Sequence, residues 1–426
     1  MERRKFIKQT SAGLGSLMVG SSVAHGNSMF NENRLQKMQT IPISKTEKPL
    51  AIAMWDFSWI LRHHRYGEFE NWDKVLEELA ERGYNAIRID AMPHFVAAES
   101  DGTIVEEFRS VKDGWQPPLW GNYFTMSFRP REALLEFLPK CRKYGIKVGL
   151  STWFSRHGTS RHDIFFDEGG LLRAWNETLS FLKENSMLDN VIYVDILNEY
   201  PAWHGFDWFK NELNKRSDIE QFKLNNPEAN IQEFEGRTGY NQLQIEFCND
   251  FINQTIITLK QEYPDIDFFA SLDSLLLEGI DLTNFSALDF HIWFVGWGKI
   301  PGIAEIDLIN QTLNYKQINA DLYTFWKENQ ESMIKWMDGR ITTVSTKAAK
   351  NKIICGNTEG WGPISWFDHP ELDWKWVKES GDIGVELALK HDNYKFLCTS
   401  NFTHPQFQGM WEDVKWHRQI TNKIKA

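Results

Sequence analysis

Short apolar runs alternate with longer amphipathic segments along this chain from Pro49 onward. Apolar runs of about four to eight residues are typical of buried strands, and apolar residues spaced three and four apart are typical of helices that cover a sheet. The pattern predicts eight strands, at residues 50–55, 86–89, 146–151, within 190–200, 267–272, 288–294, 352–357 and 394–399. It predicts helices at residues 72–82, 130–144, 170–185, 241–263 and 317–337.

Strands that alternate with helices predict βα units and a parallel sheet. Because the long segments always follow strands, the pattern predicts a (β/α)8 TIM barrel with long loops after the second, fourth and sixth strands. A doubly wound open sheet is the alternative. Such a sheet usually carries a glycine-rich phosphate turn after its first strand, and the segment from Met54 to Trp59 contains no glycine.

The first 24 residues have the make-up of an export signal. Arg3 and Arg4 precede a mild apolar run at 12–19 and small residues at 22–24. The arginine pair is typical of a twin-arginine signal, so we expect a bacterial protein that is periplasmic or extracellular. Residues 25–48 are polar without periodicity and are predicted to be a linker, which leaves 49–426 as the barrel domain.

Charge narrows the range of partners. The formal net charge is −11, and it would become −14 without residues 1–24, which hold four basic residues and one acidic residue. An acidic protein is a poor candidate for binding nucleic acid or anionic membranes, whereas neutral ligands remain open. The apolar run at 12–19 is too short for a permanent anchor, so no integral membrane segment is expected after signal removal.

Two residue types refine this picture. Aromatic residues make up 14% of the chain, with 19 Trp, which exceeds what a core usually requires and allows for flat faces that stack on sugar rings. The four cysteines, Cys141, Cys248, Cys355 and Cys398, have no CxxC spacing. This spacing argues against a zinc or redox centre, and buried free thiols are expected.

Two glutamates follow predicted strands that would face each other across a barrel. Glu199 comes after the fourth strand, behind Asn198, and Glu359 comes after the seventh. Alone, each would be read as a solvated loop charge or a surface ion pair. Together, two carboxylates across one cleft are the equipment of glycoside hydrolysis, in which one protonates the leaving oxygen and the other attacks the anomeric carbon or activates a water.

Four motifs in barrel order resemble the cellulase-type enzymes of glycoside hydrolase family 5, within the clan of retaining β-glycosidases. They are Arg88 late in the second strand, Asn198-Glu199 after the fourth, His291-Ile292-Trp293 on the sixth and Glu359 after the seventh. The resemblance extends over about residues 49–405. After the eighth strand the chain has Ser400-Asn401-Phe402, where the family commonly has a Trp.

The resemblance implies a role for each matched residue. Glu199 would be the general acid and then the general base, and Glu359 the nucleophile. Asn198 would bind the hydroxyl next to the anomeric carbon, Arg88 would keep Glu359 ionised, and His291 would hydrogen-bond near both carboxylates.

Further expectations concern the ligand and the spacing of the site. Trp153, Trp293 and Trp361 are the stacking candidates, the partner is an oligo- or polysaccharide, and no cofactor or metal is required. A retaining enzyme requires carboxyl groups about 5–5.5 Å apart. Taken alone, each residue could instead have only a structural role. Arg88 could form a buried ion pair, His291 could be a core histidine, and each Trp could pack in the core.

Two other functions are compatible with parts of the sequence. The segment with His157, His162 and Asp163, together with His63 and His64, could belong to a metal-dependent barrel hydrolase. The His-x-His on the first strand is missing, however, so a polar rim is favoured over a ligand set. A catalytically silent sugar-binding barrel is the second alternative, and the presence of both glutamates argues against it. Asp195, four positions before Glu199, could help to position a neighbour or be a buried hydrogen-bonded aspartate without such a role.

Overall fold

The computed structural model describes residues 41–110, 125–227, 239–293, 315–362 and 368–426. In this part of the chain eight parallel strands form one sheet in the order β7-β6-β5-β2-β1-β10-β9-β8. The strands are β1 (Leu50–Asp56), β2 (Ala86–Asp90), β5 (Lys147–Ser151), β6 (Val191–Asp195), β7 (Asp267–Phe269), β8 (Ala287–Asp289), β9 (Ile354–Asn357) and β10 (Tyr394–Cys398). Each coincides with a predicted strand.

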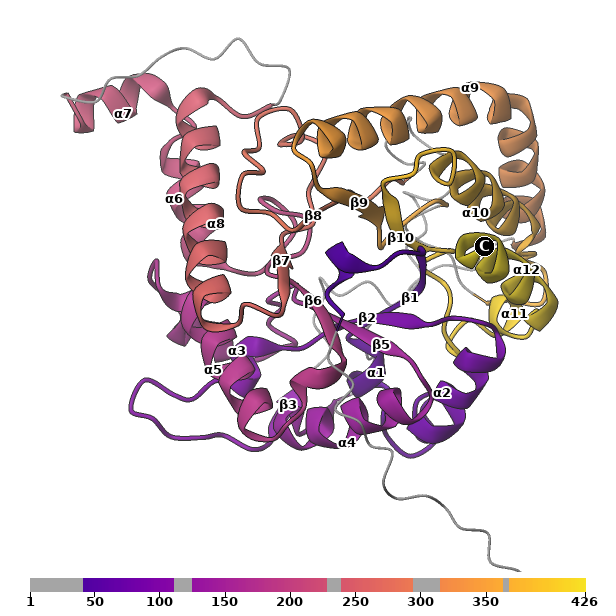
Figure 1. The fold of residues 1–426 in the computed structure, drawn as a ribbon, viewed down its shortest axis with the longest axis horizontal. Helices are drawn as coiled ribbons and strands as arrows, with labels where there is room; N and C mark the ends of the chain where they lie inside the picture. Colours follow the sequence, from indigo (N-terminus) through magenta and orange to yellow (C-terminus); the bar gives the residue numbers. More distant parts are fainter. Residues whose placement is uncertain (1–40, 111–124, 228–238, 294–314, 363–367) are drawn as a thin grey trace, which may run out of the picture. The chain divides into compact units, whose positions relative to one another are not determined.

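The sheet closes between β7 and β8. The Ser286 N–H donates to the Phe268 carbonyl at 3.0 Å, and a parallel bridge joins Leu272 to Phe290. A closed ring of parallel strands with helices between them is a (β/α)8 TIM barrel, as the sequence predicted. Figure 1 shows the strands in the middle and the helices around them.

The helices that cover the barrel are α2 (Trp72–Glu81), α4 (Pro130–Lys143), α5 (Gly170–Glu184), α8 (Gln242–Glu262), α9 (Tyr315–Lys350), α10 (Lys375–Ala388) and α12 (Val414–Lys425). Their sequences explain their ends. Asn71 caps α2 by accepting a hydrogen bond from the Lys74 N–H, and Gly83 follows the helix with φ of 84°. Pro130 begins α4, where its missing N–H costs nothing.

Shorter elements lie in the loops. They are η2 (Ile43–Lys45), α1 (Ser58–Leu61), α3 (Pro93–Val96), η3 (Arg161–Ile164), η4 (Leu188–Asn190), α6 (Asp207–Lys215), α7 (Ile219–Asn225) and α11 (Gln408–Trp411). The loop after the second barrel strand also contains an antiparallel pair, β3 (Phe108–Ser110) and β4 (Met126–Phe128). The long segments after β2 and β6 hold α3, β3, β4, α6 and α7, whereas 294–314, after the sixth barrel strand, lie outside the described residues.

An aromatic layer fills the barrel interior. The rings of Tyr193, Phe269 and Phe396 come from β6, β7 and β10, with centroids 4.9 to 6.1 Å apart. Gly149 and Gly356 make room for this layer, because a Cβ on Gly149 would lie 2.0 Å from the Tyr193 ring and one on Gly356 would lie 2.2 Å from Phe396. The polar residues of the barrel mouth therefore rest on a packed floor.

The barrel begins earlier than residue 49. Ile43 in η2 is buried, and the Ser44 N–H donates to the Asp267 carboxylate at 2.7 Å. The end of the predicted linker thus packs against the first residue of β7, a tertiary contact that its polar sequence did not indicate. The predicted export signal at 1–24, and residues 25–40 of the predicted linker, lie outside the described residues.

Among the helices that cover the barrel, α10 was missed because its sequence is poor in helix formers. Helix α10 contains Gly381 and Gly384, each of which lowers helix propensity. Both are required by packing: a Cβ on Gly381 would lie 2.5 Å from the Thr399 carbonyl oxygen, and one on Gly384 would lie 2.4 Å from the Trp361 ring. Tertiary packing overrides propensity here. Helix α12 was likewise not predicted.

Other expectations can be checked against the same coordinates. All four cysteines are buried and free, as predicted. No described helix is long and apolar enough to cross a membrane. Helix α9 continues to Lys350, beyond the predicted end at residue 337.

The contact between Gly384 and Trp361 gives a stability test. Gly384→Ala should lower the free energy of unfolding by about 1–3 kcal/mol, because the added methyl overpacks the indole. Gly339→Ala in α9 is the matched control: a Cβ there meets nothing within 4 Å, so the change should be neutral or stabilising by up to about 1 kcal/mol. Urea unfolding measures both, and equal stability of the two variants would contradict the contact.

Candidate active site

Glu199 lies at the barrel mouth, four residues beyond the end of β6. Its backbone has a positive φ of 43°, and its N–H donates to Ser271 Oγ at 2.9 Å. The Oε1 atom accepts hydrogen bonds from His291 Nδ1 at 2.9 Å and from Trp293 Nε1 at 3.3 Å. The side chain is 15% exposed. Glu199 is therefore held by its backbone and its carboxylate while one edge stays accessible.

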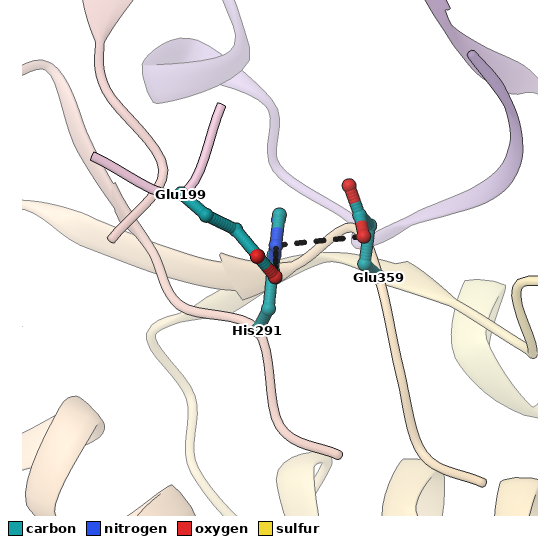
Figure 2. Close-up of side chains that lie close together, drawn as sticks. All are labelled: Glu199, His291 and Glu359. Carbon is teal, nitrogen blue, oxygen red and sulfur yellow. Dashed lines mark hydrogen bonds and ion pairs between the residues drawn. The ribbon is translucent and has the colours of Figure 1, made fainter. Parts of the chain in front are cut away.

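Glu359 lies two residues beyond β9, and its side chain is 1% exposed. Its Oε1 accepts a short hydrogen bond from Arg88 Nη1. One carboxylate oxygen of Glu199, one carboxylate oxygen of Glu359 and one ring nitrogen of His291 all lie within 4.8 Å of one another. The two carboxylates therefore approach each other to within 4.8 Å. Figure 2 shows His291 between the two glutamates, with Nδ1 at 3.7 Å from Glu359 Oε2.

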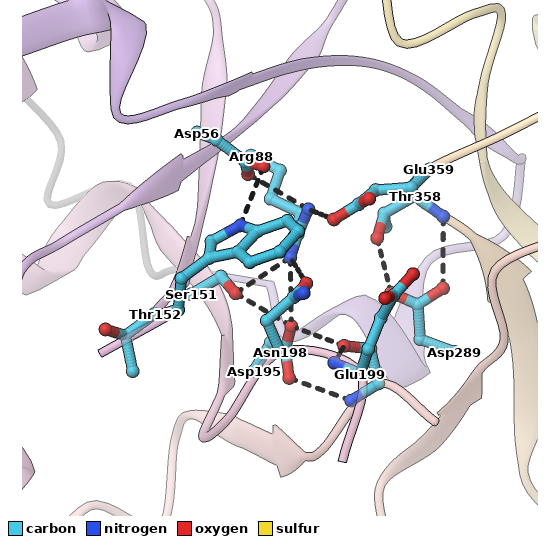
Figure 3. Close-up of polar contacts among 12 residues, drawn as sticks. Asp56, Arg88, Ser151, Thr152, Asp195, Asn198, Glu199, Asp289, Thr358 and Glu359 are labelled. Carbon is cyan, nitrogen blue, oxygen red and sulfur yellow. Dashed lines mark hydrogen bonds and ion pairs between the residues drawn. The ribbon is translucent and has the colours of Figure 1, made fainter. Parts of the chain in front are cut away.

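Arg88 is the cation that joins the elements of the site (Figure 3). It is fully buried, and its Nη1 donates to Asp56 at 3.0 Å as well as to Glu359. Its Nη2 donates to Ser151 Oγ at 3.0 Å, to Asp195 at 3.4 Å, and closely to Asn198 Oδ1. One guanidinium from β2 thus contacts residues that follow or end β1, β5, β6 and β9.

Asp56 and Asp195 accept hydrogen bonds from Arg88 and also from other residues of the site. Asp56 Oδ2 accepts a hydrogen bond from Trp153 Nε1 at 2.9 Å, which orients that indole. Asp195 Oδ2 accepts from Ser151 Oγ at 2.8 Å and from Ser271 Oγ at 2.9 Å. Since Ser271 Oγ accepts from the Glu199 N–H, Asp195 connects Arg88 to the backbone of Glu199. The positioning interpretation of Asp195 thus agrees with its contacts.

A second buried set of residues orients His291. Asp289, the last residue of β8, accepts the Thr358 N–H at 3.0 Å and the Thr358 hydroxyl at 2.5 Å. His291 Nε2 lies 3.2 Å from Thr358 Oγ1 and 3.6 Å from Asp289. The ring is therefore fixed on its Nε2 side by these two residues, with its Nδ1 directed at the glutamates.

The charges in the cluster shift one another's pKa values. Burial alone would lower the pKa of His291, but Glu359, Asp289 and Glu199 raise it well above its usual value, which favours the imidazolium form. Burial raises the pKa of Glu359 to about 8, against the lowering effect of His291 and Arg88. The expectation that Arg88 favours ionised Glu359 is right in direction, but the burial of Glu359 outweighs it.

Three buried polar atoms of this cluster have no hydrogen-bond partner: Arg88 Nε, and the pair Asn198 Nδ2 and Glu359 Oε2. Unpaired buried polar atoms are costly, and each calls for an explanation. The amide donor and the carboxylate acceptor are both of the kind that binds a hydroxyl-rich ligand or attacks one. The two atoms therefore mark where a ligand completes the site.

The structure brings most of the predicted residues together. Trp153 and Trp293 reach the cluster through their indole N–H groups, with 9% and 8% of their surfaces exposed. Trp361 differs: it is fully buried, and its Nε1 donates to the Cys398 carbonyl at 2.9 Å. Because α10 covers its ring at Gly384, it has no exposed face for stacking and belongs to the core.

Asp56, Asp289 and Thr358 were not among the predicted site residues. A signal for the aspartates was present, because β1, β2, β6 and β8 all end in Asp. A charged residue that closes an otherwise apolar strand points to the barrel mouth, where its burial requires partners. No comparable signal marks Thr358, whose role depends on Asp289 lying opposite.

The loop histidines do not form a metal site in the described residues. His63 stacks on Trp72, His157 is buried beside Phe57, and His162 bonds to Asp207. The one described group with suitable spacing is Glu199, His291 and Glu359. It does not suit a metal ion, because the Arg88 cation already contacts Glu359 and would repel a second cation there.

Arg88→Met should lower the free energy of unfolding by about 3–5 kcal/mol, since it leaves buried carboxylates without their cation. The loss should shrink as the pH falls and the carboxyl groups become protonated. Arg418→Met is the control: its partner Glu81 is half exposed, so little change is expected. Urea unfolding at two pH values tests this, and a similar effect of both substitutions would contradict the importance of the buried cation.

Comparison with known proteins agrees with this geometry. A search of curated protein sequences found no match. Residues 52–425 match the Cellulase-like family, described as sugar-binding cellulase-like. A Parabacteroides distasonis ATCC 8503 protein with a proposed glycoside hydrolase function is 30% identical, with a TM-score of 0.70 over 89% of this chain and 94% of that one.

More distant structures show the fold alone. Cellulose synthase subunit Z of Clostridioides difficile has 11% identity and a TM-score of 0.50, over 88% of this chain and 100% of its own. An endoglucanase has 12% identity and a TM-score of 0.50, over 90% and 98%. The resemblance inferred from four short motifs is confirmed, and the chain belongs to the sugar-binding, cellulase-like family of glycoside hydrolase-type (β/α)8 barrels.

Proposed function

We propose that this protein is a glycoside hydrolase that cleaves β-linked glycans with retention of anomeric configuration. The observation that carries the proposal is the distance between Glu199 and Glu359. One carboxylate oxygen of each lies within 4.8 Å of the other across the barrel mouth. Retaining enzymes place these carboxyl groups about 5–5.5 Å apart, whereas inverting enzymes leave about 6.5–9.5 Å for a water. The short separation supports the retaining mechanism.

In the first step Glu359 attacks the anomeric carbon, and the bond from that carbon to the leaving oxygen breaks. Glu199 gives its proton to that oxygen, and the sugar remains as an ester on Glu359. The contacts of Glu199 with His291 and Trp293 both fall on Oε1, which favours Oε2 as the atom that faces the leaving group. In the second step Glu199 takes a proton from water, which hydrolyses the ester.

The remaining residues would bind and orient the sugar. Asn198 Nδ2 is a buried donor without a partner, placed by the bond from Arg88 to Asn198 Oδ1. We assign it to the hydroxyl next to the anomeric carbon, where a contact strengthens in the transition state. Trp153 and Trp293 would border the sugar that occupies the site. No cofactor is required by this chemistry.

Neither alternative gains support from the site. A silent sugar-binding barrel has no need for two carboxylates around an imidazolium in a nearly closed site. A metal-dependent hydrolase would place its ion beside the Arg88 cation, which contacts Glu359. Export remains a proposal from Arg3, Arg4 and the apolar run at 12–19, which predict a twin-arginine signal and a periplasmic or extracellular address.

Glu359→Ala should abolish turnover of every glycan that the wild type cleaves. Glu199→Ala should lose activity on natural glycans but keep it on aryl glycosides whose leaving groups need no protonation. The exposed Glu77→Ala in α2 is the control and should remain fully active. Product analysis by NMR at early times should show the β-anomer first. Full activity of both active-site variants would contradict the assignment.

The same assays separate the metal alternative. Turnover should be unchanged by EDTA under the two-glutamate mechanism. Loss of activity with EDTA, restored by added divalent metal, would instead favour a metal-dependent hydrolase.

The pH dependence tests the role of His291. The acid limb of kcat/KM reports the ionisation of the free nucleophile, and the His291 cation lowers the pKa of Glu359. His291→Gln removes that cation, so the pKa of Glu359 rises further and the acid limb should move to higher pH. His64→Gln, at the loop after β1, should leave the limb in place. A limb that stays or moves to lower pH in His291→Gln would contradict this coupling.

A further inference from the structure

We propose that Trp203 is the stacking platform for the sugar on the leaving-group side of the scissile bond. This inference rests on the proposed glycosidase function and assigns the next binding position along the glycan. It starts from an unusual exposure: Trp203 is 56% exposed and is the only exposed Trp in the described parts of the chain. Because a single exposed aromatic residue is common on protein surfaces, it is the place of Trp203 beside the proposed acid that carries the inference.

The backbone places Trp203 beside the proposed acid. The N–H groups of Ala202 and Trp203 both donate to the Glu199 carbonyl at 3.1 Å, so the turn that begins at Glu199 closes with Trp203. The Gly205 N–H donates to the Trp153 carbonyl at 2.7 Å, and the Asp273 N–H donates to the Tyr200 carbonyl at 3.0 Å. These bonds fix the turn on both sides, so the indole is carried by a braced segment.

Exposure along the site indicates the direction in which a glycan leaves it. The side chain of Glu359 is 1% exposed, that of Glu199 is 15% exposed, and Trp203 is 56% exposed. The accessible side of the carboxylate pair is thus the side of Glu199. Since Glu199 would protonate the leaving oxygen, the sugar attached to that oxygen lies on the same side, toward Trp203.

A neighbouring loop also exposes an apolar side chain. Leu275, two residues after Asp273, is 46% exposed, and the Asp273 N–H is the group that donates to the Tyr200 carbonyl. Apolar side chains on two linked loops suit the apolar face of a pyranose ring. The chemical class of the occupant is thus a neutral sugar of the glycan chain.

The proposal is tested with two substrates that share a glycosyl group and differ in the leaving group. Cellotetraose cleaved in its middle releases cellobiose, whereas β-cellobiosyl fluoride releases fluoride. Both form the same cellobiosyl ester on Glu359. Only cellotetraose has a leaving sugar that needs the proton of Glu199 and could contact Trp203. If the wild type prefers mannan, the mannosyl counterparts take their place.

Trp203→Ala should lower kcat/KM for cellotetraose at least tenfold, equal to about 1.4 kcal/mol, and leave kcat/KM for the fluoride within about twofold. Trp203→Phe keeps an aromatic ring and should retain most of the tetraose activity. Ile41→Ala is the control, since Ile41 is 51% exposed near η2, which packs at the opposite end of β7. It should change neither rate.

Each other outcome has a definite meaning. Unchanged tetraose hydrolysis by Trp203→Ala would overturn the platform. An equal loss on both substrates would also overturn it, because the contact would then lie on the glycosyl side. If Glu359→Ala turned over these substrates as fast as the wild type, the proposed function itself would fail, which separates that failure from this one.

Discussion

The buried guanidinium of Arg88 is the contact on which the arrangement of the barrel mouth most depends. Arg88 has no exposed surface, and a charge in such a place persists only when opposite charges and hydrogen-bond acceptors surround it. Its partners come from four different strands or strand ends, so pairing the cation also sets the relative positions of those strands. Through Asp195 and Ser271 the same cation reaches the backbone of Glu199, while it contacts Glu359 directly.

The two glutamates differ in environment although their chemistry is the same. Glu359 is enclosed, which raises its pKa, and it contacts the permanent cation of Arg88, which lowers the pKa and so favours the ionised form that the proposed nucleophile needs. Glu199 has an accessible edge and hydrogen-bond donors on one oxygen, which suits a group that exchanges protons with a leaving oxygen and then with water. Asp289 and Thr358 hold His291 in its place between the two glutamates. Fold and proposed mechanism are thus linked through a few buried contacts rather than through the loops.

The sequence allowed the barrel and the core of the site to be predicted because both follow local rules. Apolar runs marked all eight strands, and Asn198-Glu199 and Glu359 stood at strand ends where barrels carry their chemistry. Helix α10 could not be predicted, since its glycines are favoured by contacts with Trp361 and Thr399 that are remote in sequence. For the same reason Trp361 was taken for a sugar platform: nothing local distinguishes an indole covered by a glycine from one that faces a cleft.

Charge balance at the mouth suggests why so many carboxyl groups gather there. Asp56, Asp195, Asp289, Glu199 and Glu359 surround only Arg88 and His291. Burial is the first cause of the raised pKa values of Asp56, Asp195 and Glu359, and repulsion from neighbouring carboxylates adds to it. That repulsion reflects a negative potential, which favours positive charge. The transition state of glycoside hydrolysis is oxocarbenium-like and develops positive charge at the anomeric carbon, so preorganised carboxylates stabilise it more than the neutral substrate. The strand-terminal aspartates would therefore contribute to catalysis through the field they create, without touching the sugar.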